Sequence, residues 1–274
     1  MWINRVSNTK LSMYSECGYK YLLKYHERID EVGRSEDPLQ FGSFIHKILE
    51  LGYEATTREE LQEIAAKVKP KYKFDDKKYP PSMVQKCIDN FLRFNATLAP
   101  TVGVEIDEKI ELVDDITLHI IVDRVIKSDQ GEYLIVDYKT SKREKTKQEL
   151  FFDDQLRGYA VGMAKLFNVP MSKITAAHYY PVTNNFVSVK FLPMHESAYI
   201  RTVKDKVWSI RKKKAKDFSP TKNRFCDWCG YKYYCPLFHD GPTVTSRLDE
   251  AKRLRDEKKL SEETAQADDK SQSQ

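Results

Sequence analysis

The sequence predicts an α/β fold, and two patterns support this prediction. Five stretches alternate between apolar and other side chains in the manner of β-strands: 104–112, 117–126, 133–139, 174–180 and 186–192. A stretch with helical spacing at 151–167 separates the third strand from the fourth, and Asn184–Asn185 fits a turn between the last two. An apolar helical stripe at 41–52 precedes the strands. We therefore expect a sheet with helices packed against it.

Composition sets the class of protein. The 274 residues allow one large or two small domains, and a net charge of +5 is compatible with nucleic-acid binding. No apolar run approaches the length of a membrane helix, and the first ten residues lack the form of a signal peptide. The five cysteines are unevenly spaced, which argues against a disulfide framework. We expect a soluble, cytoplasmic protein.

Acidic residues occupy positions on the predicted strands where apolar residues are expected. Glu108 shares one face of its strand with four apolar residues, and Asp123 lies between two apolar neighbours on the next strand. Asp137 and Lys139 end the third strand and point the same way, about 7 Å apart. A buried lone carboxylate is costly, so it normally has a partner or binds a metal.

Three carboxylates on adjacent strands could share one hard cation with oxygen ligands. A lysine beside them could orient a water or stabilise a developing oxyanion on a phosphate. For any single aspartate, a salt-bridged sheet edge is the simpler interpretation. The Asp-x-Lys arrangement with a second aspartate one strand earlier favours a functional site.

Three further side chains are candidates. His46 lies in the first turn of the helix at 41–52, where the helix dipole favours a neutral ring that can bind metal, although lone helix histidines are more often structural. Gln155 and Tyr159 are four residues apart and share a helix face. That face alone indicates only solvent, but packing of the helix on the sheet would bring the pair towards the carboxylates.

The cysteines suggest a second metal site. Three thiols lie within ten residues: Cys226, Cys229 and Cys235. In an intracellular protein this density indicates zinc or an iron–sulfur cluster. The fourth thiolate would be Cys17 or Cys87, and His239 is a possible nitrogen ligand for zinc.

The C-terminal part is strongly charged. A basic run ends the predicted helix at 196–216, and it includes Arg211, Lys212, Lys213 and Lys214. Such runs are usually solvated surface, but next to a phosphate-cutting site we expect contact with the DNA backbone. We expect one domain over 1–242 and a charged tail at 243–274, either a solvated helix followed by a disordered end or wholly flexible.

The chain, over about residues 10–240, resembles the PD-(D/E)XK nuclease superfamily. Within it the chain is similar to the iron–sulfur members of the RecB-like exonuclease branch, among them CRISPR-associated adaptation nucleases and phage exonucleases. The matching motifs are His46 in FGSFIHKILE, Asp123 in IVDRV, Asp137 and Lys139 in IVDYKTSK, and Gln155 and Tyr159 in QLRGYA. Two positions depart from the family pattern, Ile120 in place of glycine and Val136 in place of proline, and neither would bind metal.

The resemblance implies a restriction-endonuclease-like mixed sheet flanked by helices. It implies Mg²⁺ or Mn²⁺ held by His46, Asp123, Asp137 and the Tyr138 carbonyl. It also implies roles for three other residues: Lys139 would position the attacking water or stabilise the transition state, and Gln155 and Tyr159 would orient the lysine or the DNA. Glu108 is an additional carboxylate that only the strand alternation suggests.

The resemblance further implies a [4Fe–4S] cluster that joins the two ends of the chain through Cys17, Cys226, Cys229 and Cys235. We favour Cys17 over Cys87 because aromatic residues surround Cys17, whereas Cys87 lies on an apolar stripe.

The expected activity is that of a metal-dependent DNA exonuclease, with possible endonuclease activity. It would act on single strands or duplex ends in recombination, repair or phage DNA processing, with a recombination or repair protein as a candidate partner. The alternatives are a catalytically silent DNA-binding subunit and a zinc-stabilised structural domain. The complete Asp…Asp-x-Lys set argues against a silent subunit, which would not need it.

Overall fold

Two compact units make up the chain in this computed structural model, which describes residues 3–33 and 35–272, with only the helical backbone of 262–272. The central unit contains residues 3–8 and 35–209 of the described chain, and the terminal unit contains 9–33 and 210–272.

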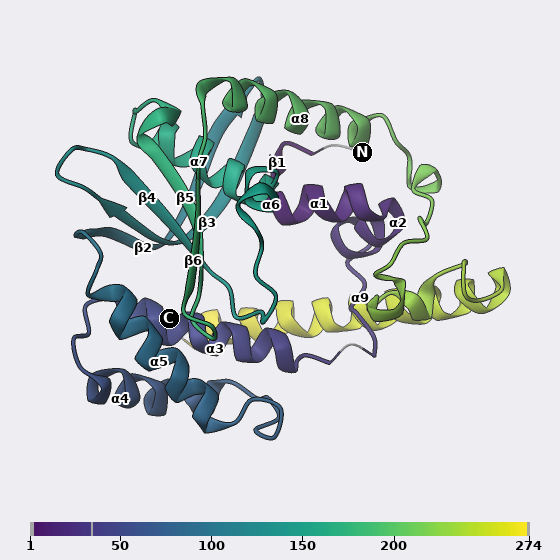
Figure 1. Ribbon diagram of the computed structural model, residues 1–274. Helices are drawn as coiled ribbons and strands as arrows, with labels where there is room; N and C mark the ends of the chain where they lie inside the picture. The colour runs from purple at the N-terminus through teal and green to yellow at the C-terminus, as the bar shows by residue number, and fades with distance from the viewer. Residues whose placement is uncertain (1–2, 34, 273–274) are drawn as a thin grey trace. The chain divides into compact units, whose positions relative to one another are not determined.

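A mixed six-stranded sheet forms the middle of the central unit (Figure 1). The strand order is β1-β3-β4-β5-β6, and β2 also pairs with β3. β1 with β3 and β4 with β5 are parallel pairs, and the others are antiparallel. The strands are β1 (Arg5–Val6), β2 (Thr101–Val113), β3 (Ile116–Lys127), β4 (Tyr133–Tyr138), β5 (Ile174–Tyr180) and β6 (Asn185–Lys190). The five longer strands were expected from alternation, whereas the two-residue β1 was not.

The described part of the central unit has six α-helices, and three of them begin at a side-chain cap. Thr57 with Glu60 and Thr146 with Glu149 form capping boxes, and Asp153 accepts two backbone N–H groups at the start of its helix. The helices are α3 (Asp37–Leu51), α4 (Arg58–Val68), α5 (Pro81–Asn95), α6 (Lys147–Phe151), α7 (Asp154–Leu166) and α8 (Pro193–Arg211), whose last two residues belong to the terminal unit. Short 3₁₀ turns are η2 (Lys69–Lys71) and η3 (Met171–Lys173). The mixed sheet with flanking helices confirms the expected α/β fold class.

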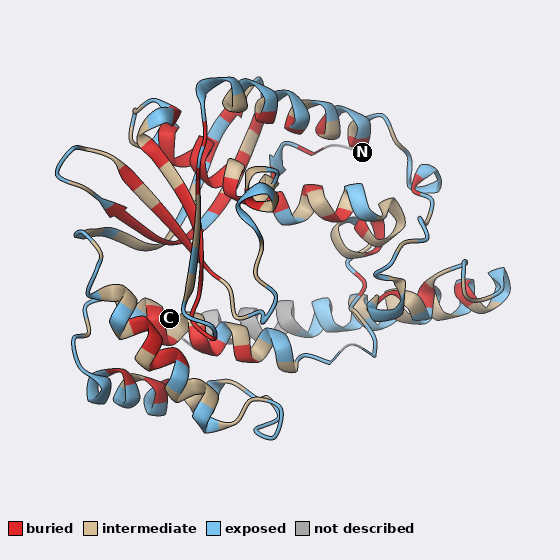
Figure 2. Cartoon of the chain, viewed as in Figure 1, coloured by how far each residue is buried: buried red, intermediate tan, exposed pale blue. Residues whose placement is uncertain are grey.

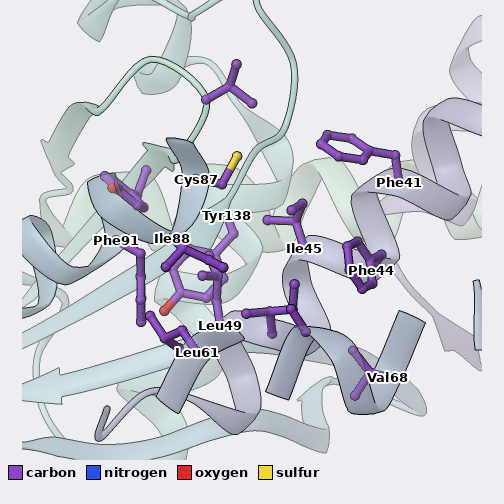
Figure 3. Close-up of a cluster of buried hydrophobic side chains, with 14 of the residues drawn as sticks. Phe41, Phe44, Ile45, Leu49, Leu61, Val68, Cys87, Ile88, Phe91 and Tyr138 are labelled. Carbon is purple, nitrogen blue, oxygen red and sulfur yellow. The ribbon is translucent and has the colours of Figure 1, made fainter. Parts of the chain in front are cut away.

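The main core of the central unit lies between α3, α4 and α5 and one face of the sheet. Figure 3 shows this cluster, in which Phe91 of α5 packs edge-on against Tyr138 of β4 with ring centroids 6.2 Å apart. Val136 and Tyr179 belong to the same cluster. Because side chains alternate along a strand, Asp137, which lies between Val136 and Tyr138, points to the opposite face of the sheet.

The terminal unit joins an N-terminal segment to a C-terminal one. Leu23 and Ile29 pack with Tyr231 and Tyr234, and the Tyr231 hydroxyl donates to the Ile29 carbonyl. Figure 2 shows the buried residues of both segments in red. The helical elements are α1 (Asn8–Glu16), whose first residue belongs to the central unit, α2 (Gly18–Tyr21), the π-helix η1 (Leu22–His26), the 3₁₀ turns η4 (Ala215–Asp217), η5 (Cys226–Trp228) and η6 (Lys232–Tyr234), and α9 (Gly241–Gln272).

The segment expected to be a charged tail is largely helical. α9 runs from Gly241 to Gln272, so the described part of this segment contains a helix, and residues 273–274 lie outside the described residues. Among the described helices, none combines the length and apolar character needed to cross a bilayer.

Candidate functional site

The candidate site lies where strands β3 and β4 separate. Their antiparallel ladder ends at the pair Arg124 and Val136. Beyond it, the backbone N–H of Tyr138 donates to the Asp123 carboxylate over 2.6 Å, in place of a backbone carbonyl on β3. On its other edge β4 stays paired with β5 as far as Tyr138. The opening of the ladder therefore holds one aspartate in a fixed orientation at the end of β4.

His46, Glu105 and Asp123 lie together beside this opening. One ligand atom from each lies within 4.8 Å of the other two, and His46 Nδ1 is 3.5 Å from Asp123 Oδ1. Burial lowers the pKa of His46, but the hydrogen bond and charge of Asp123 outweigh burial, so the pKa lies above its ordinary value. The three side chains line a cleft of about 480 Å³ whose wall includes Lys47 and Thr140.

Asp137 and Lys139 form a close ion pair at the end of β4. Lys139 Nζ lies 2.6 Å from Asp137 Oδ2, and Asp137 is only 2% exposed. Burial raises the pKa of Asp137 to about 6, although Lys139 opposes this shift. Burial lowers the pKa of Lys139, but the charge of Asp137 and its hydrogen bond raise it more, so the lysine stays charged.

Gln155 and Tyr159 connect helix α7 to this lysine. Lys139 Nζ donates to Gln155 Oε1 over 3.1 Å, and Gln155 Nε2 donates to the Tyr159 hydroxyl over 2.7 Å. Both residues lie in the first two turns of α7, which the Asp153 cap starts at Asp154. The i,i+4 pair therefore faces the sheet and not solvent, because α7 packs against β3, β4 and β5.

Glu105 is the carboxylate that sequence reasoning missed. Its φ of +46° lies in the left-handed region, which glutamate rarely adopts, and this interrupts the alternation of β2. Glu108 pairs with Ile120 further along the strand and is not a member of the group with His46 and Asp123. Burial raises the pKa of Glu105, and the charge of Asp123 adds to the shift.

The donor set of the cleft fits a divalent cation. One imidazole nitrogen and two carboxylate oxygens lie within reach of one another. Asp137 is not a member of this group, but it is a buried carboxylate whose pKa the charge of Asp123 helps to raise. Carboxylate-rich sites with one imidazole suit Mg²⁺ and Mn²⁺. His46, Glu105, Asp123 and Asp137 could hold such an ion there.

The cysteines lie in different units. Cys17, Cys226, Cys229 and Cys235 line one cavity of the terminal unit, and Thr221 and Asn223 donate backbone N–H groups to the sulfurs of Cys17 and Cys226. Among the described residues, no three thiol sulfurs lie within 4.8 Å of one another. Cys87 is buried on α5 of the central unit, where burial raises its pKa to about 12.

The basic run follows the end of α8 in the terminal unit. Lys212 and Lys214 are exposed, whereas Lys213 lies over the rings of Tyr14 and Phe218. Arg211 ends α8 and is partly buried. The helix ends five residues earlier than expected, so most of the run lies in the segment after it.

The family of the chain follows from one of three comparisons with known proteins. The family model of the PD-(D/E)XK nuclease superfamily matches residues 5–236. No curated protein matches the chain. Among solved structures, the crystal structure of SSO0001 is similar, with 15% sequence identity, a TM-score of 0.42, and coverage of 87% of this chain and 89% of that chain. Because the family model spans most of the sequence, and includes every residue of the cleft, the chain belongs to the PD-(D/E)XK nuclease superfamily.

Proposed function

We propose that the protein is a Mg²⁺- or Mn²⁺-dependent DNA exonuclease of the RecB-like, iron–sulfur branch. Membership of the nuclease superfamily implies hydrolysis of nucleic acid with a divalent metal. The observation that carries the proposal is the convergence of His46, Asp123, Asp137 and Lys139 at one strand end. A DNA-binding subunit without catalysis would not need a half-buried lysine paired with a buried aspartate beside a set of metal ligands.

Each residue has a proposed role. His46, Asp123, Asp137 and the Tyr138 carbonyl bind the metal, and Glu105 adds a carboxylate. When bound, the metal supplies charge that stabilises the attacked phosphate and acidifies a water. Lys139 stays charged and orients that water or stabilises the developing negative charge. Gln155 orients the lysine by accepting its hydrogen bond, and Tyr159 in turn accepts a hydrogen bond from Gln155 and holds its amide in place.

Alanine substitutions at the centre of the site test the proposal. Asp123→Ala, Asp137→Ala and Lys139→Ala should each abolish cleavage of DNA in Mn²⁺ and leave the circular dichroism spectrum unchanged. Lys139→Ala should still bind Mn²⁺ in calorimetry, because the lysine acts on the reaction and not on the ion. Loss of Mn²⁺ binding in that variant would overturn its assigned role.

A separate experiment tests whether the protein cleaves from DNA ends, because the path of the DNA past the site determines exonuclease or endonuclease action. Oligonucleotides labelled at one end and blocked at the other, in single- and double-stranded form, would give strand preference and polarity. Cleavage of closed circular DNA would instead assign the protein as an endonuclease.

We also propose a [4Fe–4S] cluster bound by Cys17, Cys226, Cys229 and Cys235. The four half-buried thiols line one cavity, and backbone N–H groups point at two of the sulfurs, an arrangement that favours anionic sulfur. A tetrahedral zinc site needs sulfurs about 3.8 Å apart, given Zn–S bonds of about 2.3 Å. Metal analysis of the purified protein decides between zinc bound in this way and an iron–sulfur cluster.

The remaining assignments follow from these. We propose that residues 1–242 act as a single nuclease domain, because the family model extends across both units. The basic run, Arg211 with Lys212, Lys213 and Lys214, would contact DNA phosphates. Roles in recombination, repair or phage DNA processing, with a partner protein, would follow from exonuclease activity.

A further inference from the structure

A buried histidine lies behind Asp137, on the neighbouring strand. In the parallel pairing of β4 with β5, His178 is the register partner of Asp137, so both side chains project from the same face of the sheet. His178 has no exposed surface, and its Nε2 lies 3.4 Å from Asp137 Oδ2. Nε2 meets hydrogen-bond geometry with neither Asp137 nor any other described group, so a buried nitrogen without a partner faces the carboxylate. No sequence motif pointed to this histidine.

The other ring nitrogen begins a chain of hydrogen bonds that leads away from the site. His178 Nδ1 lies 3.2 Å from the hydroxyl of Tyr180, which is 1% exposed. That hydroxyl accepts the backbone N–H of Lys145 over 2.8 Å. Lys145 belongs to the segment between β4 and α6 that immediately follows Lys139.

The two groups at the ends of this series of hydrogen bonds determine which atom donates in each bond. The backbone N–H of Lys145 can only donate, and an ionised Asp137 can only accept. His178 has no exposed surface, which favours the neutral ring over the charged one. A neutral ring has one donor and one acceptor, so Nε2 carries the proton that faces Asp137, and Nδ1 accepts from Tyr180. The opposite tautomer would place a lone pair of the ring against the carboxylate.

We propose that His178 is a positioning residue for the nuclease site, which holds the Asp137 carboxylate through Nε2–H and is itself held as that tautomer by Tyr180 and the Lys145 backbone. The inference rests on the proposed function in one respect, that Asp137 binds the metal. Outer-shell partners of this kind orient a ligand before the ion arrives. The half-exposed Lys139 contacts the same Asp137 oxygen, Oδ2, that His178 faces. The lysine and the histidine would therefore hold the carboxylate together.

The first test reads the tautomer directly in the metal-free protein. In a sample labelled with ¹⁵N-histidine, long-range ¹⁵N–¹H correlation spectra distinguish Nε2–H from Nδ1–H rings, and the His178 signals are those absent from His178→Gln. We expect Nε2–H at neutral pH. An Nδ1–H ring would overturn the inference. This measurement does not depend on nuclease activity or on metal, so it still decides the inference if the proposed function fails.

The second test measures Mn²⁺ affinity by calorimetry in matched variants. His178→Leu should weaken binding by roughly 10- to 100-fold, the usual effect of losing an outer-shell partner. His178→Gln keeps an N–H donor at the Nε2 position and should stay within about threefold of the original protein. If glutamine binds as weakly as leucine, or leucine as tightly as histidine, the positioning role is wrong.

Tyr180→Phe tests the same role without changing His178, because it removes only the hydroxyl beside Nδ1 and keeps nearly all of the buried side-chain volume. It should weaken Mn²⁺ binding by several-fold, because Nδ1 loses its donor. Tyr179→Phe is its control: that hydroxyl bonds Asn184 instead, and its loss should leave Mn²⁺ affinity unchanged. Equal effects of the two substitutions would contradict the relay.

Discussion

At the residue scale, the site combines groups whose charges cost free energy in the absence of metal. Asp137 is ionised although buried, and Glu105 lies across the β2–β3 ladder from Asp123, between flanking pairs that are in register. Like charges opposite one another on neighbouring strands are destabilising. Glu105 also has a left-handed backbone that favours glycine. The metal-free protein therefore carries strain and repulsion at the positions where a cation would offset them.

Ionisation of Asp137 makes the free energy of unfolding of the metal-free protein depend on pH. Between its ordinary pKa of 3.8 and the raised value of about 6, the folded protein holds a proton that the unfolded chain has lost. Ionisation of Asp137 therefore lowers the free energy of unfolding as the pH rises through that window, and the cost is fully present above pH 6. We expect Asp137→Asn to stabilise the metal-free protein at pH 8 by about 1–3 kcal/mol.

Thermal melting in a chelator, at pH 8 and again near pH 4, checks this expectation. The gain from Asp137→Asn should shrink towards the lower pH, where the aspartate is protonated. Added Mn²⁺ should stabilise the original protein and not the variant. An Asp137→Asn protein that melts below the original at pH 8 without metal would show that the ionised carboxylate is not costly.

Two nearby glutamates make a matched pair for the metal site. Glu105→Gln should weaken Mn²⁺ binding on the order of tenfold, because it removes one anionic oxygen from the group with His46 and Asp123. Glu108→Gln, three residues along the same strand, should leave the affinity unchanged. Calorimetry of both variants decides between the carboxylate that alternation predicts and the one that the structure places in the cleft. Weaker binding in Glu108→Gln alone would reverse the assignment.

The positions of Glu105 and Glu108 on β2 could not both be predicted from the sequence. Alternation places Glu108 on the face of β2 shared with Ile110, which is buried. A single left-handed residue redirects Glu105, and no local composition signals it, because asparagine, aspartate and glycine are the residues that usually mark such positions. By contrast, Asp137 and Lys139 could be placed from sequence because β4 is short and regular.

At the element scale, α7 holds Gln155 and Tyr159 over the sheet through two glycines. A Cβ at Gly162 would lie 2.5 Å from the Cδ1 end of Ile120, and one at Gly158 would lie 2.1 Å from Asn8 Nδ2. Elements with strong periodicity, such as α3 and α7, were predictable from sequence. β1 was not, because two residues paired with β3 carry no pattern of their own.

The glycines should differ in their tolerance of alanine. Gly158→Ala pushes against the buried hydrogen bond from the Tyr199 hydroxyl to Asn8, and should lower the free energy of unfolding by about 1–3 kcal/mol. Gly162→Ala meets only the flexible end of Ile120, and the better helix propensity of alanine should offset part of the cost. Urea denaturation of the two variants measures the difference. A Gly162→Ala protein less stable than Gly158→Ala would contradict this account of the packing.

At the scale of the whole molecule, the four cysteines proposed as cluster ligands line one cavity of the terminal unit, and the sequence did not predict the structure that forms that cavity. The terminal unit is built from two segments about 200 residues apart in the chain, and its cysteines come from both. Tyr19 and Tyr231, which line the same cavity, have pKa values raised by burial, to about 12 for Tyr19. The thiols therefore lie in a partly dry environment formed by both ends of the chain.

Closing so long a loop restricts the unfolded chain, and binding of a cluster becomes free energy of folding. Cys17→Ser should remove the broad absorbance near 400 nm expected of an iron–sulfur protein purified without oxygen, and should lower the melting temperature. Cys87→Ser is the control: its thiol is buried in the core of the central unit, away from the cavity lining, and the variant should keep its colour and nuclease activity. A colourless original protein with stoichiometric zinc would reject the cluster. Loss of colour in Cys87→Ser with retention in Cys17→Ser would reject the ligand set, and with it the proposal that the two ends of the chain are joined through metal.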